Sequence, residues 1–150
     1  MQAQDAANLI RFRFPGRRIV TTNGCFDILH VGHLRLLEYA KSQGDYLIVG
    51  VNSDSSVKRY KPGRPINNEF DRAYLLSRLS CVDYVDVFEE DTPESFLRKV
   101  RPEIHVKSKS GYKGIEKDIL KEWNGKLVLM DDEEGYSTTN ILNKWKSLNT

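Results

Sequence analysis

Two of the three histidines in the 150-residue chain, His30 and His33, fall in one four-residue unit with the sequence HVGH. Residues three apart lie on one face of a helix, so at a helix start both imidazoles would point to the same spot. Gly32 between them carries no side chain and lets a ligand approach the backbone. The free N–H groups of a first helical turn, together with the helix dipole, favour an anion. This spacing therefore predicts a polyphosphate site with two hydrogen-bond donors directed at it.

Two other interpretations of the histidine pair stay open. Both side chains could bind zinc, although Cys25 is the one further histidine or cysteine near them. They could also be ordinary surface histidines. The glycines Gly24 and Gly32, and a position between a strand and a helix, favour the polyphosphate site. Cys25 is expected to be a small packing residue, since no activating base for a nucleophilic thiol is evident.

The elements that must position this unit alternate along the chain. Short β-branched runs predict five strands, at residues 18–22, 46–51, 84–88, 104–107 and 126–130. Helical spacing of apolar residues predicts helices at 31–43, 69–79, 115–123 and 137–148, and another that Thr92 caps, with Pro93 in its first position, ending near Val100. Residues 52–68 are polar and predict a loop whose start could form a short helix.

Strands that alternate with helices indicate an α/β fold, Rossmann-like and doubly wound, with a five-stranded parallel sheet and helices on both faces. Ligands of such sheets bind beyond the carboxyl ends of the strands. The polar loops after the first, second, fourth and fifth strands should therefore converge on the histidine pair. No linker or repeat divides the chain, so residues 1–150 are expected to form one domain. Residues 1–17 predict an N-terminal helical extension that packs on the edge and does no chemistry.

Composition excludes several classes of protein. Lys and Arg number 23 against 21 Asp and Glu, a net charge of +2, which is too balanced for a dedicated nucleic-acid or membrane-surface protein. No apolar run approaches the roughly 20 residues that span a bilayer. Residues 1–5 do not resemble the start of a signal peptide, and two cysteines give no disulfide framework. We expect a cytoplasmic protein with neither nucleic-acid nor membrane partners.

Four stretches of the sequence resemble one family. They are residues 24–33 (GCFDILHVGH), 51–57 (VNSDSSV), 64–72 (RPINNEFDR, which leads into CVDYV at 81–85) and 134–139 (EGYSTT). Together they are similar to the cytidylyltransferase-like nucleotidyltransferases, over about residues 17–146. The likeness is greatest to heptose 1-phosphate adenylyltransferase domains, and glycerol-3-phosphate cytidylyltransferases are the next most similar.

The resemblance implies a reaction in which a phosphate oxygen of a sugar or polyol phosphate attacks the α-phosphorus of a nucleoside triphosphate and pyrophosphate leaves. It implies a Mg²⁺ cofactor bound mainly through phosphates, and a homodimer. The catalytic residues that it implies are His30, His33, Lys58 and Arg72. The residues that it implies for nucleotide binding are Asn23, Gly24, Cys25, Phe26, Gly32, Ser137 and Thr138. The residues that it implies for acceptor binding are Asp27, Lys61, Lys107 and Tyr112.

Simpler structural roles stay open for several of these residues. Asp27 could be a loop or capping aspartate, and Ser137 could serve as a helix cap. Lys58 and Lys61 could belong to a solvated basic loop. Arg72 could be an exposed helix arginine.

Two departures from the family pattern bear on the substrates. Asp132 stands where the cytidylyltransferases have an arginine, which favours ATP over CTP. Residues 108–111 replace a Gly-Gly-Asp segment of the heptose branch, with the aspartate missing and one residue added. This change indicates a different or more anionic acceptor, unless it is a neutral loop variation.

The expected function is transfer of a nucleotide to a heptose-like sugar phosphate in surface-glycan precursor synthesis. A CTP-dependent enzyme for a polyol phosphate and a nucleotide-binding regulator without turnover are the alternatives.

Overall fold

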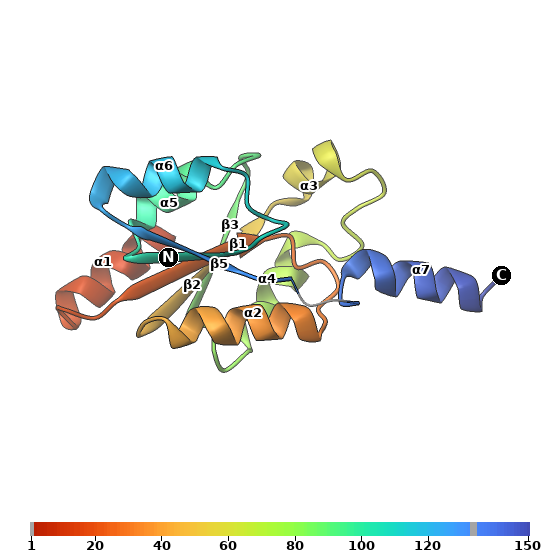
Figure 1. Cartoon of the computed structure of the whole chain (residues 1–150), viewed down its shortest axis with the longest axis horizontal. Coiled ribbons are helices and arrows are strands. Elements are labelled where there is room, and N and C mark those ends of the chain that lie inside the picture. The colour runs from red at the N-terminus through yellow and green to blue at the C-terminus, as the bar shows by residue number, and fades with distance from the viewer. Residues whose placement is uncertain (1, 133–134) are drawn as a thin grey trace.

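The computed structural model describes residues 2–132 and 135–150 and has the α/β architecture that the sequence predicts (Figure 1). Five strands form one parallel sheet in the order β3-β2-β1-β4-β5. The strands are β1 (Ile19–Gly24), β2 (Tyr46–Asn52), β3 (Tyr84–Phe88), β4 (Ile104–Ser108) and β5 (Lys126–Met130). The helices are α1 (Ala3–Arg13), α2 (Val31–Ser42), α3 (Asp54–Tyr60), α4 (Glu69–Ser77), α5 (Glu94–Val100), α6 (Ile115–Leu120), a 3-10 turn (Lys121–Trp123) and α7 (Thr138–Leu148). The predicted fold class is confirmed.

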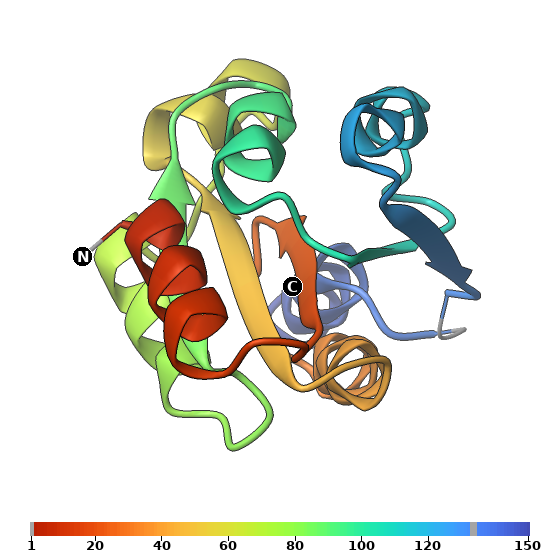
Figure 2. The ribbon, with the colours of Figure 1, turned by 90° about the vertical axis from the view of Figure 1, so that its left-hand side faces the viewer.

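Helices cover the sheet on both faces, as a view along the sheet shows (Figure 2). Leu37 of α2 and Leu76 of α4 pack on one face, against Val20 and Val49 of the central strands. The other face carries α1, α5 and α6. Because β1 and β2 are covered on both sides, their side chains are buried almost without interruption. The continuous apolar run at residues 46–51 reflects this environment.

The N-terminal helix α1 contacts the edge of the sheet as predicted, and it also covers part of one face. Ala3, Ala6 and Ala7 are buried in the same cluster as Ile19 and Ile48 of the central strands. The helix therefore covers a face of the sheet as well as contacting the edge strand β3, where the backbone N–H of Ala3 donates to Asp86.

One predicted helix start shifts, and one short helix that the sequence left open is found. Pro93 is the residue before α5, and α5 begins at Glu94 without a side-chain cap, so the prediction that Thr92 caps this helix was wrong by one residue. The start of the polar segment 52–68 does form a helix, α3. Ser53 caps it by accepting a hydrogen bond from the backbone N–H of Ser56.

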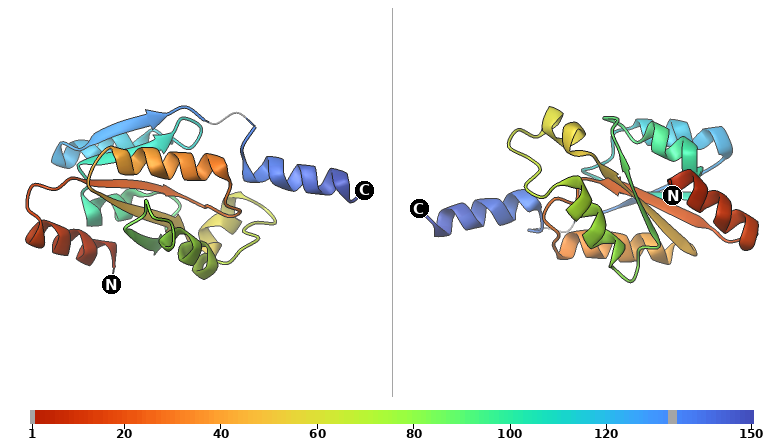
Figure 3. Two further views of the ribbon diagram at one scale, coloured as in Figure 1. Left: turned by 90° about the horizontal axis from the view of Figure 1, so that it is seen from below. Right: turned by 180° about the vertical axis from the view of Figure 1, so that it is seen from behind.

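The order of the strands reverses at β1, with β2 on one side and β4 on the other. A crevice forms outside the carboxyl ends of parallel strands at such a point. The last helix, α7, begins beside this crevice and runs away from the body of the protein (Figure 3). Of its residues, Thr138 alone is buried. Within the described ranges, no helix is both long and apolar enough to cross a membrane.

Candidate active site

A cleft of about 1060 Å³ opens at the carboxyl ends of β1 and β4. Most of the residues singled out in the sequence contribute to its wall. These are Asn23, Gly24, Cys25, Phe26, Asp27, His30, Gly32, His33, Lys61, Lys107, Ser137 and Thr138. Three predicted site residues, Lys58, Arg72 and Tyr112, are not part of the wall.

The two histidines stand together at the start of α2. His30 is the residue before the helix and His33 lies in its first turn. Their rings are stacked, with centroids 3.8 Å apart and planes 24° from parallel. The backbone N–H of His30 donates to Nδ1 of His33 at 3.3 Å. Because Nδ1 accepts this bond, the neutral ring of His33 carries its proton on Nε2, which is then a donor for a ligand.

Both histidines are neutral at physiological pH. The pKa of His33 is lowered to about 4, mainly by burial and to a smaller extent by its neighbours His30 and Lys61. Burial also lowers the pKa of His30. Each ring can therefore offer an N–H hydrogen bond rather than a positive charge.

Gly32 is required by the packing around the histidines. A Cβ at this position would lie 2.9 Å from Cε1 of His30 and 3.0 Å from Cβ of Tyr136. Real Cβ atoms do not approach so closely, so a side chain at residue 32 would displace the His30 ring or the segment before α7. The absence of a side chain thus keeps the first turn of α2 open to the cleft.

Asp27 organises a loop. Its carboxylate accepts hydrogen bonds from Arg64 Nε at 3.0 Å and from the backbone N–H groups of Ile66 and Asn67 at 2.9 Å. The side-chain amide of Asn67 also donates a hydrogen bond to the backbone carbonyl of Asp27 at 2.9 Å. These contacts hold the segment between α3 and α4 against the cleft and occupy the carboxylate that was predicted to face the acceptor.

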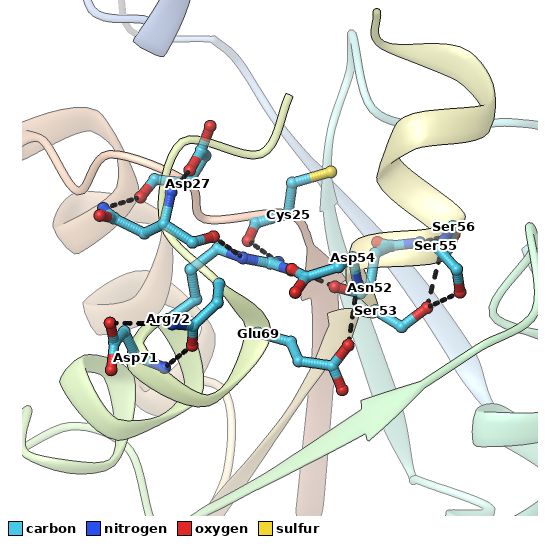
Figure 4. A network of polar contacts seen from close by, with 12 residues as sticks. Cys25, Asp27, Asn52, Ser53, Asp54, Ser55, Ser56, Glu69, Asp71 and Arg72 are labelled. Carbon is cyan, nitrogen blue, oxygen red and sulfur yellow. Dashed lines mark hydrogen bonds and ion pairs between the residues drawn. The ribbon is translucent and has the colours of Figure 1, made fainter. Parts of the chain in front are cut away.

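Arg72 corrects the sequence interpretation most clearly (Figure 4). Its side chain is fully buried rather than directed at phosphate. Its guanidinium donates at 2.7–2.9 Å to the carbonyls of Cys25, Asn52 and Asn67, and at 2.8 Å to Asp54 Oδ1. Arg72 therefore ties the loop after β1 to the end of β2, the start of α3 and the segment before α4.

Of the two lysines that the sequence predicted for the site on this segment, Lys61 lines the cleft and Lys58 does not. Helix α3 ends at Tyr60, and Lys61 has an extended backbone, with φ −132° and ψ 86°. Lys61 consequently turns into the cleft, where its Nζ lies 3.8 Å from Cys25 Sγ, while Lys58 stays exposed on α3. A spacing of three residues brings two side chains together only where the helix continues.

The opposite wall is built by β4 and α6. Lys107 is buried, and its Nζ donates to the carbonyl of Asn23 at 2.9 Å. Glu116, a fully buried carboxylate on α6, also lines the cleft and was missed by the sequence analysis. Its place between the apolar residues Ile115 and Ile119 of α6 is the signal that could have found it. The Tyr112 hydroxyl contacts the carbonyl of Gly114 at 3.4 Å instead of facing the cleft.

The start of α7 completes the site. Ser137 caps the helix by accepting a hydrogen bond from the backbone N–H of Asn140 at 2.9 Å. Thr138 Oγ1 donates to the carbonyl of Ile28 at 3.3 Å, which joins α7 to the loop before α2. The N-termini of α2 and α7 therefore border the same cleft, and both favour an anion. In the part of the chain that the structure describes, no three His, Cys, Asp or Glu side chains gather to hold a metal ion.

A comparison with known families agrees with this geometry. The sequence model of one family, described as Cytidylyltransferase-like, matches residues 21–144. The chain belongs to the cytidylyltransferase-like family. The resemblance seen in the sequence is thereby confirmed.

Curated relatives of this cytidylyltransferase-like chain carry the name Bifunctional protein HldE. The protein from a Nitratiruptor species is 57% identical over 136 residues, which cover 88% of this chain and 28% of that protein. The protein from a strain of Helicobacter pylori is 53% identical over 132 residues, covering 87% of this chain and 28% of its own length. The chain thus spans less than a third of these relatives.

Solved structures share the fold of this cytidylyltransferase-like chain. A lipopolysaccharide core biosynthesis protein from Thermoplasma volcanium superposes with a TM-score of 0.70 at 29% identity, covering 79% of this chain and 100% of that one. The pantoate-beta-alanine ligase of Francisella tularensis, solved with beta-gamma ATP and beta-alanine, gives a TM-score of 0.61 at 14% identity, covering 99% of this chain and 77% of that one. The second likeness concerns the fold alone.

Proposed function

We propose that this chain is a nucleotidyltransferase that transfers AMP from ATP to a heptose 1-phosphate-like sugar phosphate and releases pyrophosphate. The stacked His30–His33 pair, at the helix N-terminus that borders the cleft, is the observation that carries the proposal. The similarity to proteins named HldE and to a lipopolysaccharide core biosynthesis protein supports a place in surface-glycan precursor synthesis.

In the proposed reaction, an oxygen of the acceptor phosphate forms a bond with the α-phosphorus of ATP. The bond from the α-phosphorus to the bridging oxygen breaks, and pyrophosphate leaves with the electron pair. No covalent bond to the protein is needed, so catalysis consists of positioning and charge stabilisation. The neutral imidazole of His33 supplies an Nε2–H donor to a phosphate oxygen, and His30 stacks against it. A fixed donor of this kind contributes most where charge develops in the transition state.

The remaining cleft residues hold the two anionic substrates. Backbone N–H groups at the starts of α2 and α7 bind triphosphate oxygens, with the α7 turn fixed by Ser137 and Thr138. Lys61 and Lys107 offer ammonium groups from different walls of the cleft. We assign Lys61 to the phosphates near the histidines, because it is close enough to influence the titration of His33. We assign Lys107 to the acceptor phosphate.

Mg²⁺ is proposed as the cofactor. The carboxylate of Asp27 on the cleft wall is engaged by Arg64 and two backbone N–H groups, so it offers no ready carboxylate cage for a metal ion. This donor set fits an ion held mainly through triphosphate oxygens and water. When bound, Mg²⁺ would neutralise charge on the departing pyrophosphate.

ATP is preferred over CTP in this proposal. At the position where the cytidylyltransferases have an arginine, Asp132 presents a carboxylate that hydrogen-bonds to Ser110. A carboxylate cannot take the place of a guanidinium that pairs with a triphosphate. A CTP-dependent reaction on a polyol phosphate is the second candidate, and the nucleotide that is consumed separates the two.

A homodimer in the cytoplasm, where nucleoside triphosphates are made, is the proposed state of the protein. Helix α7 is exposed along most of its length and presents Ile141, Trp145 and Leu148 on one side. An isolated helix of this length is marginal in water, which supports its packing against a second copy. Sedimentation of the wild-type chain and of Trp145→Ser tests this, since only the wild type should be dimeric.

Pyrophosphate release with Mg²⁺ tests the proposed function. ATP and CTP are compared, with D-glycero-D-manno-heptose 1-phosphate as the acceptor and glycerol 3-phosphate as the alternative acceptor. We expect release with ATP and the heptose phosphate. Release with CTP alone would establish the second candidate. Nucleotide binding without release on either acceptor would point to a regulator.

A further inference from the structure

Glu116 has no part in the function proposed above, yet it is the most deeply buried carboxylate at the cleft. Its residue exposure is 0%, and it reaches the cleft wall from α6. Lys107 reaches the same wall from β4 and is 7% exposed. The two side chains thus bring a carboxylate and an ammonium group to the same cleft, where both are shielded from water and Glu116 acts on the charge of Lys107. Shielding costs free energy for each charge alone and strengthens the attraction between them.

The surroundings of Lys107 oppose its positive charge. The pKa of Lys107 is lowered to about 8; burial is the main cause and the charges of Lys113 and Lys61 add to it, whereas Glu116 and Cys25 act to raise it. His105, two residues before Lys107 on β4, is neutral because burial lowers its pKa to about 3. Glu116 is therefore the carboxylate that offsets the cost of burying this ammonium group.

Glu116 also fixes the segment that passes over Lys107. Its two carboxylate oxygens accept the backbone N–H of Lys113 at 3.3 and 3.4 Å. The same segment approaches Lys107 so closely that a Cβ at Gly111 would lie 3.3 Å from the Lys107 Nζ and 3.0 Å from Ser108 Oγ. One carboxylate thus acts both on the charge of Lys107 and on the loop that surrounds it.

We propose that Glu116 is a positioning residue that keeps the Lys107 ammonium protonated and directed at the acceptor phosphate. The inference deepens the proposed function and rests on it for the identity of the phosphate. Glu116 touches neither substrate in this account. It acts through Lys107, whose Nζ is held at the end of β1 by the carbonyl of Asn23. The charge on Lys107 then decides how tightly a sugar phosphate binds between pH 7 and 9.

The variant Glu116→Gln tests the proposal, because glutamine keeps the size of the side chain and an acceptor for the Lys113 N–H but removes the charge. Loss of an opposite charge moves a pKa by about one unit or more. We therefore expect KM for the sugar phosphate to rise about tenfold at pH 8.5 and to stay near the wild-type value at pH 6. The KM for ATP should change less than twofold at both pH values. Asp118→Asn, an exposed carboxylate on the same helix, is the matched control and should behave as wild type.

Restoring a permanent positive charge at residue 107 provides a second test. Arginine stays protonated throughout this range, so Lys107→Arg in the Glu116→Gln background should remove the pH dependence of KM. If KM for Glu116→Gln rises equally at pH 6 and pH 8.5, the carboxylate has a merely structural role and the proposal is overturned.

A readout without turnover separates this inference from the proposed function. The Lys107 side-chain resonance is followed in ¹³C-lysine-labelled protein by NMR and assigned by its loss in Lys107→Arg. We expect its titration midpoint near pH 8 in the wild type, and at least one unit lower in Glu116→Gln. An unchanged midpoint would overturn the inference even if the enzyme is active. A shifted midpoint in a protein that releases no pyrophosphate would leave the charge relationship standing and reject the proposed function instead.

Discussion

Ser110 and Asp132 join two loops on one side of the cleft through a pair of hydrogen bonds. The backbone N–H of Ser110 donates to Asp132 Oδ2 at 3.1 Å, and its hydroxyl donates to Oδ1 at 2.5 Å. The adjacent residues Lys109 and Asp131 form an ion pair at 2.6 Å between the same two loops. The two places where the sequence departs from the family pattern, the 108–111 loop and position 132, are therefore in contact. The acidic connection after β5 therefore holds the altered loop after β4 in place.

Asp132→Ala should loosen the loop between β4 and α6 and weaken acceptor binding. Hydrogen bonds of this kind contribute about 0.5–1.5 kcal/mol to the stability of the loop conformation. We therefore expect KM for the sugar phosphate to rise about two- to tenfold with kcat nearly unchanged. Steady-state kinetics with varied acceptor measures this. Asp131→Ala is the matched control: its ion pair is exposed and contributes little, so KM should change less than twofold. Equal effects of the two variants would show that this contact does not position the loop.

His30→Ala and His33→Ala should each lower kcat about a hundredfold or more. That loss corresponds to one fixed transition-state donor, about 2.7–4 kcal/mol. Stability should change little in either variant, because both residues lie at the junction of a loop and a helix. Single-turnover rates and thermal unfolding measure the two effects separately. A wild-type rate in either variant would remove that histidine from the site.

Arg72→Ala should destabilise the protein rather than abolish a phosphate contact. The change leaves the carbonyls of Cys25, Asn52 and Asn67 without their donor and breaks the ion pair with the partly buried Asp54, at a cost of about 3–5 kcal/mol. Urea unfolding measures the loss. Arg78→Ala, which removes a surface guanidinium 4.9 Å from the centre of the Tyr74 ring, serves as control and should cost less than about 1 kcal/mol. A stable Arg72→Ala protein with lost activity would return Arg72 to a direct role with substrate.

Acid should unfold the protein partly through its buried histidines. Burial lowers the pKa of His105 to about 3 and that of His33 to about 4, from an ordinary 6.5. Between pH 6.5 and 4 the unfolded chain binds more protons than the folded one, so stability falls as the pH falls. Each histidine contributes at most about 1.4 kcal/mol per pH unit.

Urea unfolding at pH 7, 6 and 5 measures this dependence. His105→Gln should flatten the decline, because its amide can still bond to Thr21 but does not titrate. A decline as steep in His105→Gln as in the wild type would mean that other groups cause the acid sensitivity.

Much of the fold could be predicted because its signals are local. The apolar run at 46–51 is long enough for a strand buried on both faces, and helical segments between the strands require parallel pairing. The site could be located because HVGH at a helix start brings His30 and His33 together through helix geometry alone.

The corrected residues depend on contacts between distant segments. The burial of Arg72 follows from carbonyls on three separate segments, which no local pattern reports. Lys58 and Lys61 separate because α3 ends between them. Glu116 belongs to the site only because α6 packs against β5, the neighbour of β4 in the sheet. In each case the sequence shows the chemistry of the side chain but not its neighbours.

The most direct test of the account is to identify the product. Wild-type protein, Mg²⁺, ATP and D-glycero-D-manno-heptose 1-phosphate are mixed and followed by ³¹P NMR, with His33→Ala in parallel. We expect a diphosphate-linked ADP-sugar and an equal amount of pyrophosphate from the wild type, and at most about a hundredth of that rate from His33→Ala. ATP consumed without an ADP-sugar, or the same product at the same rate from both proteins, would contradict it.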